Sequence, residues 1–260
     1  MMRSLFTSAT GMLGQQLNMD VISNNLANVN TSGFKKSRVE FEDLIYQTLR
    51  QPGAAQADGQ LIPTGIQVGM GARAVAVSKQ FSQGDYQQTE KQLDLAIEGD
   101  GFFRLLKGDQ EVYTRNGAFK LDNNGVITDS HGYILQPQFT VPEGTTNITI
   151  DPSGAITALA SDGAELAQAQ LTLYKFANNG GLFARGKNLL TPTPASGDPV
   201  EGVPGQDEFG TLAQGFLEMS NVSVVDEMVN MIVAQRAYEA NSKAIQTSDQ
   251  MLQQANNLKR

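Results

Sequence analysis

The chain has 260 residues, no cysteine, one histidine and a formal net charge of −8, with 40% hydrophobic and 18% charged residues. This length can bury a sizeable core, and the missing cysteines exclude disulfides and thiolate metal sites. The acidity lies in the middle of the chain, because residues 1–36 carry a net charge of +2 and residues 226–260 a net charge of zero. An acidic middle argues against nucleic acid as a partner, since phosphate binding needs a basic surface.

Residues 3–29 predict a helix with an apolar stripe. Large apolar residues recur there every seven positions, at Leu5, Met12, Met19 and Leu26. Gly11 and Gly14 each cost a helix about 1 kcal/mol relative to alanine, so they indicate close helix contact or a terminus ordered only by assembly. The helix is expected to end in the segment before Gly33, a residue suited to a C-terminal stop. The same region lacks the continuous apolar run and cleavage site of a secretory signal, and no run is long enough to span a membrane.

Residues 34–71 predict a connecting region with an extended arm. Residues 38–41 have the pattern of a strand start, and 41–49 that of a short helix. From residue 51 onward all periodicity is lost, and turn-forming or helix-breaking residues dominate. The residues that mark the arm are Gln51, Pro52, Gly53, Pro63 and Gly65.

Residues 72–216 change to a β pattern. Short apolar or alternating runs are separated by turn pairs such as Asp100-Gly101, Asn116-Gly117 and Asn124-Gly125. Short strands at this spacing with Asn-Gly turns predict an antiparallel β domain built from hairpins.

Residues 222–258 predict a second, longer striped helix. Val224, Met231, Tyr238, Ile245 and Leu252 fall seven residues apart. The positions three residues further on are small or polar (Ala234, Asn241, Ser248), so a partner helix could approach closely. Uncharged amides are frequent on both terminal helices, which suits helices surrounded by other helices.

We therefore expect the two terminal helices to pack on each other, with everything between them inserted. The predicted fold class is α+β: a discontinuous coiled-coil pair, an extended connecting arm and an inserted antiparallel β domain. The predicted domains are residues 1–33 with 222–260, residues 34–71 and residues 72–221.

No catalytic, cofactor-binding or metal site is predicted. Residues 69–74 match the dinucleotide pattern GxGxxA, but a β-like alternation follows where that motif needs a helix. Residues 122–125 (DNNG) lack the ligand spacing of a calcium loop and predict a hairpin turn. The single histidine, His131, lies in a predicted turn, and one histidine without cysteine leaves no zinc cage.

Four motifs in order along the chain resemble the flagellar basal-body rod and hook protein family. Residues 24–35 (NNLANVNTSGFK) resemble the N-terminal signature. Residues 96–103 (AIEGDGFF) and 113–119 (YTRNGAF) resemble the start of the family's β domain. Residues 220–222 (SNV) with 227–232 (EMVNMI) and 235–243 (QRAYEANSK) resemble the C-terminal signature. The motif residues singled out are Asn24, Asn25, Asn28, Gly33, Phe34, Gly99, Gly101, Phe102, Asn221, Gln235, Arg236, Tyr238 and Asn241.

Within the family, the length and the segment 46–71 resemble the distal-rod members. That resemblance implies a non-enzymatic subunit, exported by the flagellar type III apparatus without a cleaved signal. It implies a helical homopolymer in the periplasm, a rigid hollow drive shaft that carries torque from motor to hook and serves as export channel. The implied partners are further copies, proximal-rod, hook and hook–rod junction proteins, and the surrounding peptidoglycan and outer-membrane rings, with no direct membrane insertion.

Two other readings remain open at this point. One is another axial subunit of the proximal-rod or hook type. The other is a secreted β-domain binding module or adhesin on a coiled-coil stalk, which would form a stable small oligomer instead of a polymer.

Overall fold

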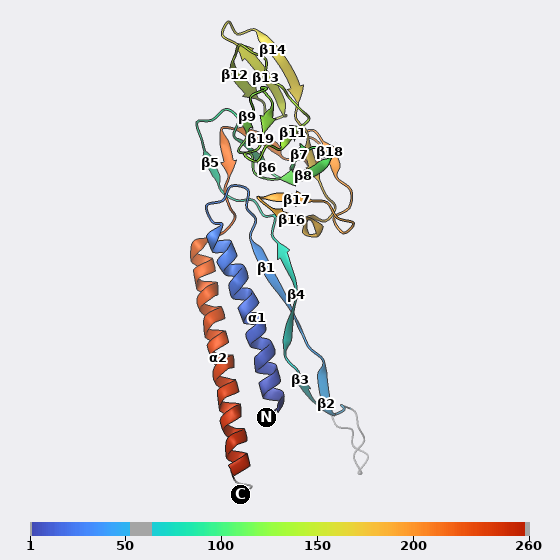
Figure 1. Ribbon diagram of the computed structural model, residues 1–260. Helices are drawn as coiled ribbons and strands as arrows, with labels where there is room; N and C mark the ends of the chain where they lie inside the picture. The colour runs from blue at the N-terminus through green and yellow to red at the C-terminus, as the bar shows by residue number, and fades with distance from the viewer. Residues whose placement is uncertain (1, 53–63, 258–260) are drawn as a thin grey trace. The chain divides into compact units, whose positions relative to one another are not determined.

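The structure, a computed structural model, describes residues 2–52 and 64–257. These residues form two compact units (Figure 1). The helical unit comprises residues 2–27, 37–52, 64–79 and 223–257, and the β unit comprises residues 28–36 and 80–222. The predicted division at 1–33 with 222–260, 34–71 and 72–221 stays a prediction.

The helical unit holds the two terminal helices and two antiparallel ribbons. Helix α1 (Met2–Ala27) packs against α2 (Val224–Asn257) on one side and against the ribbon of β1 (Ser37–Asp43) and β4 (Ala72–Lys79) on another (Figure 1). Strand β2 (Tyr46–Arg50) pairs with β3 (Ile66–Gly69) in the second ribbon. Ser223 caps α2 because its Oγ accepts from the Asp226 backbone N–H at 3.4 Å. The predicted packing of the terminal helices, and with it the α+β fold class, is confirmed.

The prediction of a short helix over residues 41–49 is wrong. The segment instead contributes to β1 and β2, each with an antiparallel partner. A helix of two turns would form few hydrogen bonds to offset the cost of its nucleation. As strands, the same residues form backbone hydrogen bonds with β4 and β3, which lie further along the chain and leave no sign in the local pattern.

The β unit contains sixteen strands in the described residues, each two to six residues long. A seven-stranded antiparallel sheet has the order β16-β17-β8-β7-β11-β10-β9, a three-stranded sheet the order β12-β13-β14, and the rest pair two by two. The strands are β5 (Tyr86–Gln88), β6 (Leu95–Glu98), β7 (Phe103–Lys107), β8 (Gln110–Thr114), β9 (Lys120–Leu121), β10 (Ile127–Thr128), β11 (Ile134–Gln136), β12 (Thr145–Ile150), β13 (Ala155–Ala160), β14 (Glu165–Gln170), β15 (Leu173–Lys175), β16 (Phe183–Gly186), β17 (Leu189–Thr191), β18 (Val200–Gly202), β19 (Thr211–Gln214) and β20 (Phe216–Glu218), with a 3-10 turn η1 (Asn179–Gly181).

The β unit has its own hydrophobic core. Its larger cluster includes Ile97, Leu105 and Ile156, each fully buried. A second cluster is aromatic: Tyr113 meets Tyr174 and Phe176 edge-on, with ring centroids 5.6 and 4.9 Å apart. Burial of this size explains why many short strands, each marginal alone, form one stable unit.

Two sequence motifs have structural explanations. Gly71 has a φ of 113°, and a Cβ there would lie 2.2 Å from Thr10 Oγ1, so glycine permits close approach of the turn before β4 to α1. The residues 122–125 form the turn between β9 and β10, where Gly125 N–H donates to the Asp122 carbonyl at 2.9 Å. The GxGxxA pattern therefore spans the end of β3 and the start of β4, and the DNNG pattern is a hairpin turn.

Candidate assembly surface and buried ionic cluster

The contact between α1 and α2 is a seam of small and polar residues in one antiparallel register. Ser4 Oγ lies 3.1 Å from Ser248 Oγ, and a Cβ on Gly11 would lie 2.9 Å from Asn241 Nδ2. Two heptads further along α1, Asn25 Nδ2 lies 3.4 Å from Glu227 Oε2. Each step of seven residues along α1 is matched by seven residues back along α2, which is the spacing of a coiled-coil seam.

The larger heptad residues flank this seam. Leu5, Met12, Met19 and Leu26 of α1 and Met231, Ile245 and Leu252 of α2 are half-buried, while Val224 and Tyr238 are exposed. The buried residues of α2 are Glu227, Ala234 and Ser248. Small side chains at the seam let the two backbones approach closely, so the large residues are pushed to the sides.

Over residues 224–233, the face of α2 opposite the seam is apolar and exposed. This α2 apolar face consists of Val224, Val225, Met228, Val229, Ile232 and Val233, with exposed fractions of 41–70%. At 100° per residue, Val225, Val229 and Ile232 point away from the side on which Ala234 meets α1. Contiguous apolar surface of this kind marks an interaction site in a protein that is stable in water.

A second apolar surface lies between α1 and β4. This α1–β4 groove has a volume of about 270 Å³ and is lined by Thr10, Leu13, Gly14, Leu17, Ala72, Arg73 and Ala74. Leu13 at its edge is 68% exposed. A Cβ on Gly14 would lie 3.0 Å from the Phe41 ring, so glycine permits the close contact between α1 and β1 beneath the groove.

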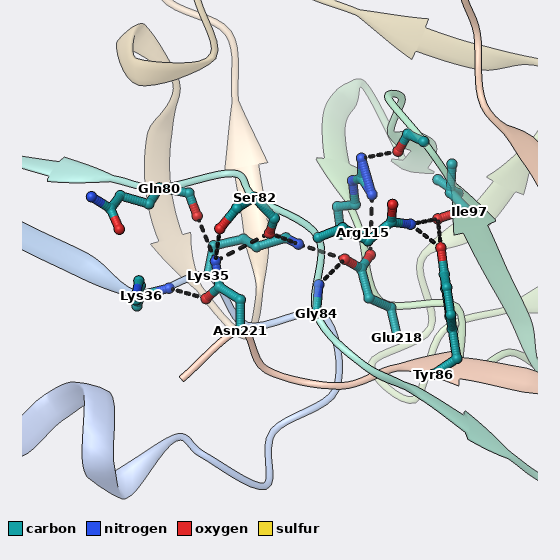
Figure 2. Close-up of polar contacts among 12 residues, drawn as sticks. Lys35, Lys36, Gln80, Ser82, Gly84, Tyr86, Ile97, Arg115, Glu218 and Asn221 are labelled. Atoms are coloured by element: carbon teal, nitrogen blue, oxygen red, sulfur yellow. Dashed lines mark hydrogen bonds and ion pairs between the residues drawn. The ribbon is translucent and has the colours of Figure 1, made fainter. Parts of the chain in front are cut away.

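In the β unit, three charged residues form a buried ionic cluster: Lys35, Arg115 and Glu218 (Figure 2). Their exposed fractions are 3%, 4% and 1%. Glu218 Oε1 accepts from Lys35 Nζ at 2.5 Å and from the Gly84 backbone N–H at 3.1 Å, and Glu218 Oε2 accepts from Arg115 Nη1 at 3.1 Å. The cluster thus joins the N-terminal signature, a β-domain motif and β20.

The cluster holds two cations and one carboxylate, so its charges do not balance. Backbone carbonyls add to the shell: Lys35 Nζ donates to Ser82 O at 2.7 Å, and Arg115 Nη2 to Gly99 O at 2.5 Å, while the buried Arg115 Nε has no partner among the described residues. Burial lowers the pKa of Lys35 from its ordinary 10.5, and Arg115 adds to this effect while Glu218 opposes it. Carbonyl oxygens and the shared carboxylate together replace water as acceptors for the two buried cations.

Asn221 makes a second polar junction beside the cluster (Figure 2). Its Oδ1 accepts from Lys36 N–H at 2.8 Å, and its Nδ2 donates to the carbonyls of Gln80 and Ser82 at 2.9 and 3.1 Å. Gln80 N–H also donates to Lys36 O at 2.9 Å. Lys36, Gln80 and Asn221 lie at or near the β-unit ends of three chain segments that continue into the helical unit. One amide therefore holds three such segments together.

The other predicted motif residues have separate roles. Gly33 (φ 69°) lets the backbone approach Asn116, where a Cβ would lie 2.6 Å from the backbone nitrogen. Asn25 is buried and exchanges two 2.9 Å hydrogen bonds with the Ser37 backbone. Phe34 and Phe102 are buried in the β unit. Asn24 is exposed on α1, and Asn28 Oδ1 accepts from Thr31 Oγ1 in the turn after α1.

Gly99 and Gly101 have φ values of 110° and 148°, which glycine adopts most readily. On α2, Gln235 and Arg236 are exposed and Asn241 faces Gly11. In the arm, Gln51 and Pro52 are exposed, and Gly65 lies against Arg50 O and Pro52. Gly53 and Pro63 lie outside the described residues.

Sequence reasoning missed Glu218, and it named Lys35 and Arg115 only as letters within motifs. Nothing in the local pattern around Glu218 separates a buried carboxylate from an exposed one on a short strand. The available signal was indirect: a lysine and an arginine inside two different motifs both need a buried partner if those motifs meet.

Within residues 2–52 and 64–257, no three histidine, aspartate or glutamate side chains gather as a metal site. His131 lies 3.2 Å from Asp129 Oδ2 in a turn. Neither helix in the described part of the chain is long and apolar enough to cross a membrane. The features that stand out are therefore packing surfaces and a structural ion cluster.

Comparison with known proteins identifies the family. Residues 5–35 match the model for the flagella basal body rod protein, residues 96–158 that for the flagellar hook protein FlgE/F/G D1 domain, and residues 213–258 that for the flagellar basal body rod FlgEFG protein C-terminal. The flagellar basal-body rod protein FlgG of Borreliella burgdorferi is 50% identical over 264 residues, and that of Bacillus subtilis 41% over 266, with 100% of both chains covered in each case.

The flagellar hook protein FlgE of Helicobacter mustelae is 43% identical over 138 residues, which cover 52% of this chain and 30% of that protein. The full-length likeness is thus to rod proteins, and the likeness to that hook protein is partial. The full-length likeness to the rod proteins, together with the packed terminal helices and the inserted β region, shows that the chain belongs to the family of flagellar basal-body rod proteins FlgG, the structural subunits of the distal rod.

Proposed function

We propose that the chain polymerises with copies of itself into a rigid, hollow helical shaft that carries torque from the flagellar motor to the hook and leaves a channel for export. The observation that carries this proposal is the α2 apolar face, six exposed hydrophobic residues on the side away from α1. A contiguous apolar surface of this kind is stabilised when another protein surface buries it. In a rod of repeated subunits, neighbouring copies bury this face.

Torque transmission requires that each subunit deform little under load. The buried ionic cluster and the Asn221 junction support such stiffness, because they cross-connect segments that are far apart in the chain. Breaking a buried ion pair exposes a charge to a low-dielectric interior and costs several kcal/mol. The arrangement therefore resists separation of these segments.

The arm is the proposed bridge to a neighbouring subunit. Every residue of β2 is exposed, including Tyr46 and Leu49, and Ile66 of β3 is exposed as well. An isolated two-stranded ribbon is marginal in water, so a neighbouring surface would stabilise it. We extend this proposal to residues 46–71 as a whole, including the part outside the described residues.

As a member of this family, the chain assembles with other axial flagellar subunits in the basal-body rod. We propose that these partners are proximal-rod, hook and hook–rod junction proteins, that the rings at the peptidoglycan and outer membrane surround the shaft, and that the type III apparatus exports the chain.

Electron cryomicroscopy of basal bodies tests the proposed function. A strain without this protein should produce basal bodies that lack the distal segment of the rod and the hook beyond it. Restoring the wild-type chain should restore both. A complete rod in the deletion strain would contradict the proposal.

A further inference from the structure

The charges of the β unit are unevenly distributed. Residues 28–36 and 80–222 hold 10 lysines and arginines against 18 aspartates and glutamates, which gives this unit a net charge of −8. Residues 121–174 hold six acidic residues and no lysine or arginine, whereas residues 175–197, which contain β16 and β17, hold three cations and no acidic residue. An acidic unit therefore contains one basic segment.

This basic segment includes an exposed hairpin at the edge of the seven-stranded sheet. Strand β16 is the last strand of that sheet, and all four of its residues are exposed. Phe183 is 62% exposed, more than any other large hydrophobic residue of the described β unit. Arg185 donates to the uncharged Gln110 side chain, and neither Arg185 nor Lys187 forms an ion pair with another described residue. We call Phe183, Arg185 and Lys187 the basic hairpin surface.

The composition of the basic hairpin surface indicates the chemistry of its partner. Aromatic and arginine side chains are the types most enriched where proteins meet, and a free sheet edge is open to contact with another chain. Two cations without a counter-charge favour an acidic partner, and the exposed Phe183 ring favours one with an apolar side chain among its carboxylates. The expected partner is thus a small acidic surface with one exposed aliphatic residue.

The other end of the β unit has a surface of this chemistry. The first residue of β12 pairs with the last residue of β13, so the loop before β12 and the turn between β13 and β14 lie at the same end of the three-stranded sheet. Three exposed acidic residues occur there, none of them in an ion pair with another described residue, next to a leucine that is 42% exposed. We call Glu143, Asp162, Glu165 and Leu166 the acidic tip.

The two surfaces cannot meet within one chain. The β13–β14 turn and the β16–β17 hairpin lie at opposite ends of the β unit (Figure 1). A second copy, however, brings an acidic tip to the basic hairpin surface of the first. Because the rest of the β unit is acidic, two β units repel each other in most other orientations, so the basic hairpin surface also selects the orientation of the pair.

We infer that the basic hairpin surface of one copy docks onto the acidic tip of a second copy, with Phe183 packed against Leu166 and the two cations facing the carboxylates. Since the two surfaces lie at opposite ends of the β unit, each added copy points in the same direction as the copy before it. Such a head-to-tail contact does not close in pairs and extends along a polymer. The inference rests on the proposed function and adds a contact between β units to those of the helical unit.

Cysteine cross-linking tests the contact directly, because the chain has no cysteine of its own. The Ala164→Cys/Ala184→Cys variant places one exposed cysteine in each surface. As the sole copy of the chain in the cell, it should give a ladder of covalent multimers when isolated basal bodies are treated with a short bis-maleimide. The matched control is Ser153→Cys/Ala184→Cys, whose first cysteine lies in the exposed turn at the other end of β13 and should give no ladder. A band at the dimer alone, or an equal ladder from the control, would overturn the inference.

A substitution at the centre of the basic hairpin surface gives a second test. Phe183→Glu removes the ring and places a carboxylate opposite the acidic tip, so the fraction of basal bodies with a complete rod should fall sharply. Val200→Glu makes the same kind of change at a residue that is 59% exposed on β18 and should leave rod completion unchanged. The circular dichroism of both purified chains should match wild type. Equal rod completion in the two variants would contradict the contact.

Charge exchange tests the pairing of the two surfaces. Arg185→Glu/Lys187→Glu should lower rod completion and motility, and so should Asp162→Lys/Glu165→Lys. The chain with all four substitutions restores opposite charges across the contact and should recover both. A fourfold variant that folds but assembles no better than either double variant would overturn the inference.

The outcomes separate the two proposals. Complete rods that contain the cysteine variant and give no ladder would overturn the inferred contact and leave the proposed function intact. A strain that lacks the chain altogether and still completes its rods would overturn the proposed function itself.

Discussion

At the scale of single residues, the β unit shows how buried charge is tolerated when its partners are fixed. Glu218 faces Lys35 and Arg115 and also accepts from a backbone N–H, so its carboxylate has three donors. The excess positive charge is met by the carbonyls of Ser82 and Gly99. Each member of the cluster belongs to a different part of the chain, so the cluster can form only in the folded β unit.

The unequal charges predict unequal mutational effects. Glu218→Gln leaves two buried cations without a carboxylate, and we expect it to lower the free energy of unfolding by about 3–5 kcal/mol. Lys35→Met leaves Arg115 and Glu218 as a neutral pair and should cost markedly less. Urea unfolding of the purified chain measures both, with the exposed Glu90→Gln as control. Equal losses in the two cluster variants would contradict this charge balance.

Tyr113 gives a second prediction at this scale. Its side chain is fully buried, and its hydroxyl has no hydrogen-bond partner among the described residues. Because an unsatisfied buried hydroxyl costs about 1–3 kcal/mol, Tyr113→Phe should raise the free energy of unfolding by about 1 kcal/mol at neutral pH. The ring contacts with Tyr174 and Phe176 are retained. A loss of stability in urea unfolding would show that the hydroxyl has a partner.

The same residue predicts a dependence on alkaline pH. Burial, with a smaller contribution from Glu111, raises the pKa of Tyr113 from 10 to about 12. Between these two values the unfolded chain ionises while the folded chain stays neutral, so wild-type stability should fall as the pH rises from about 10 to about 12. Tyr113→Phe should weaken this fall without abolishing it, since the pKa of Tyr86 is also raised to about 12. Unfolding curves across this range measure the difference, and identical slopes would contradict it.

At the scale of elements, α1 depends on its neighbours for stability. It contains two glycines, and its few buried residues (Ser8, Ile22, Asn25) offer little apolar area. Helical stability in proteins comes mainly from the packing of one face and not from intrinsic propensity. The seam with α2 and the contact with the β1–β4 ribbon therefore account for the stability of α1.

This dependence predicts the effect of a truncation. A chain that lacks its last 35 residues loses nearly all of α2 and with it the partners of Ser4, Gly11 and Asn25. We expect its circular dichroism at 222 nm to fall by more than the loss of α2 alone explains, because α1 should unfold as well. The near-ultraviolet signal of the aromatic cluster in the β unit should be retained and serves as the control. An undiminished α1 signal would place the main support of α1 elsewhere.

At the scale of the whole molecule, the single chain exposes apolar surface that no other part of the chain covers. The α2 apolar face, the α1–β4 groove and the exposed β2–β3 ribbon all belong to the helical unit. The β unit, in contrast, buries two hydrophobic clusters of its own, and its exposed large hydrophobic side chains each lie on a different strand (Tyr86, Leu121, Leu166, Phe183 and Val200). This difference fits a subunit that polymerises through its helical unit.

The arm supplies the prediction at this scale. Deleting residues 47–63 removes most of β2 and the part of the arm between β2 and β3 but leaves β1, β4 and both helices in the sequence. If the arm bridges neighbouring subunits, rods built from this variant should be flexible or curved in electron cryomicroscopy. A replacement of residues 47–63 by a Gly-Ser segment of equal length controls for chain length and should give the same defect. Straight rods of normal stiffness would contradict the bridging role.

Much of this organisation could be read from local patterns. Heptad spacing predicted both terminal helices, Asn-Gly turns predicted the antiparallel β region, and four ordered motifs indicated the family, which full-length relatives confirm. These signals are local or periodic, so they can be recognised in the sequence without knowledge of the fold. The prediction of a helix over 41–49 fails for the strand at 46–50 because its partner β3 lies on the far side of residues 51–65.

The sequence by itself determined the helices, the β region, the family and the need of α2 for a partner. Only the tertiary structure decided which side of each helix is the seam: the small residues face each other, and the large residues that marked the stripe lie beside it. It also decided that Glu218 joins Lys35 and Arg115. The physical reason is the same in both cases, since burial and pairing of a side chain depend on residues that are brought together from 103 or more positions away along the chain.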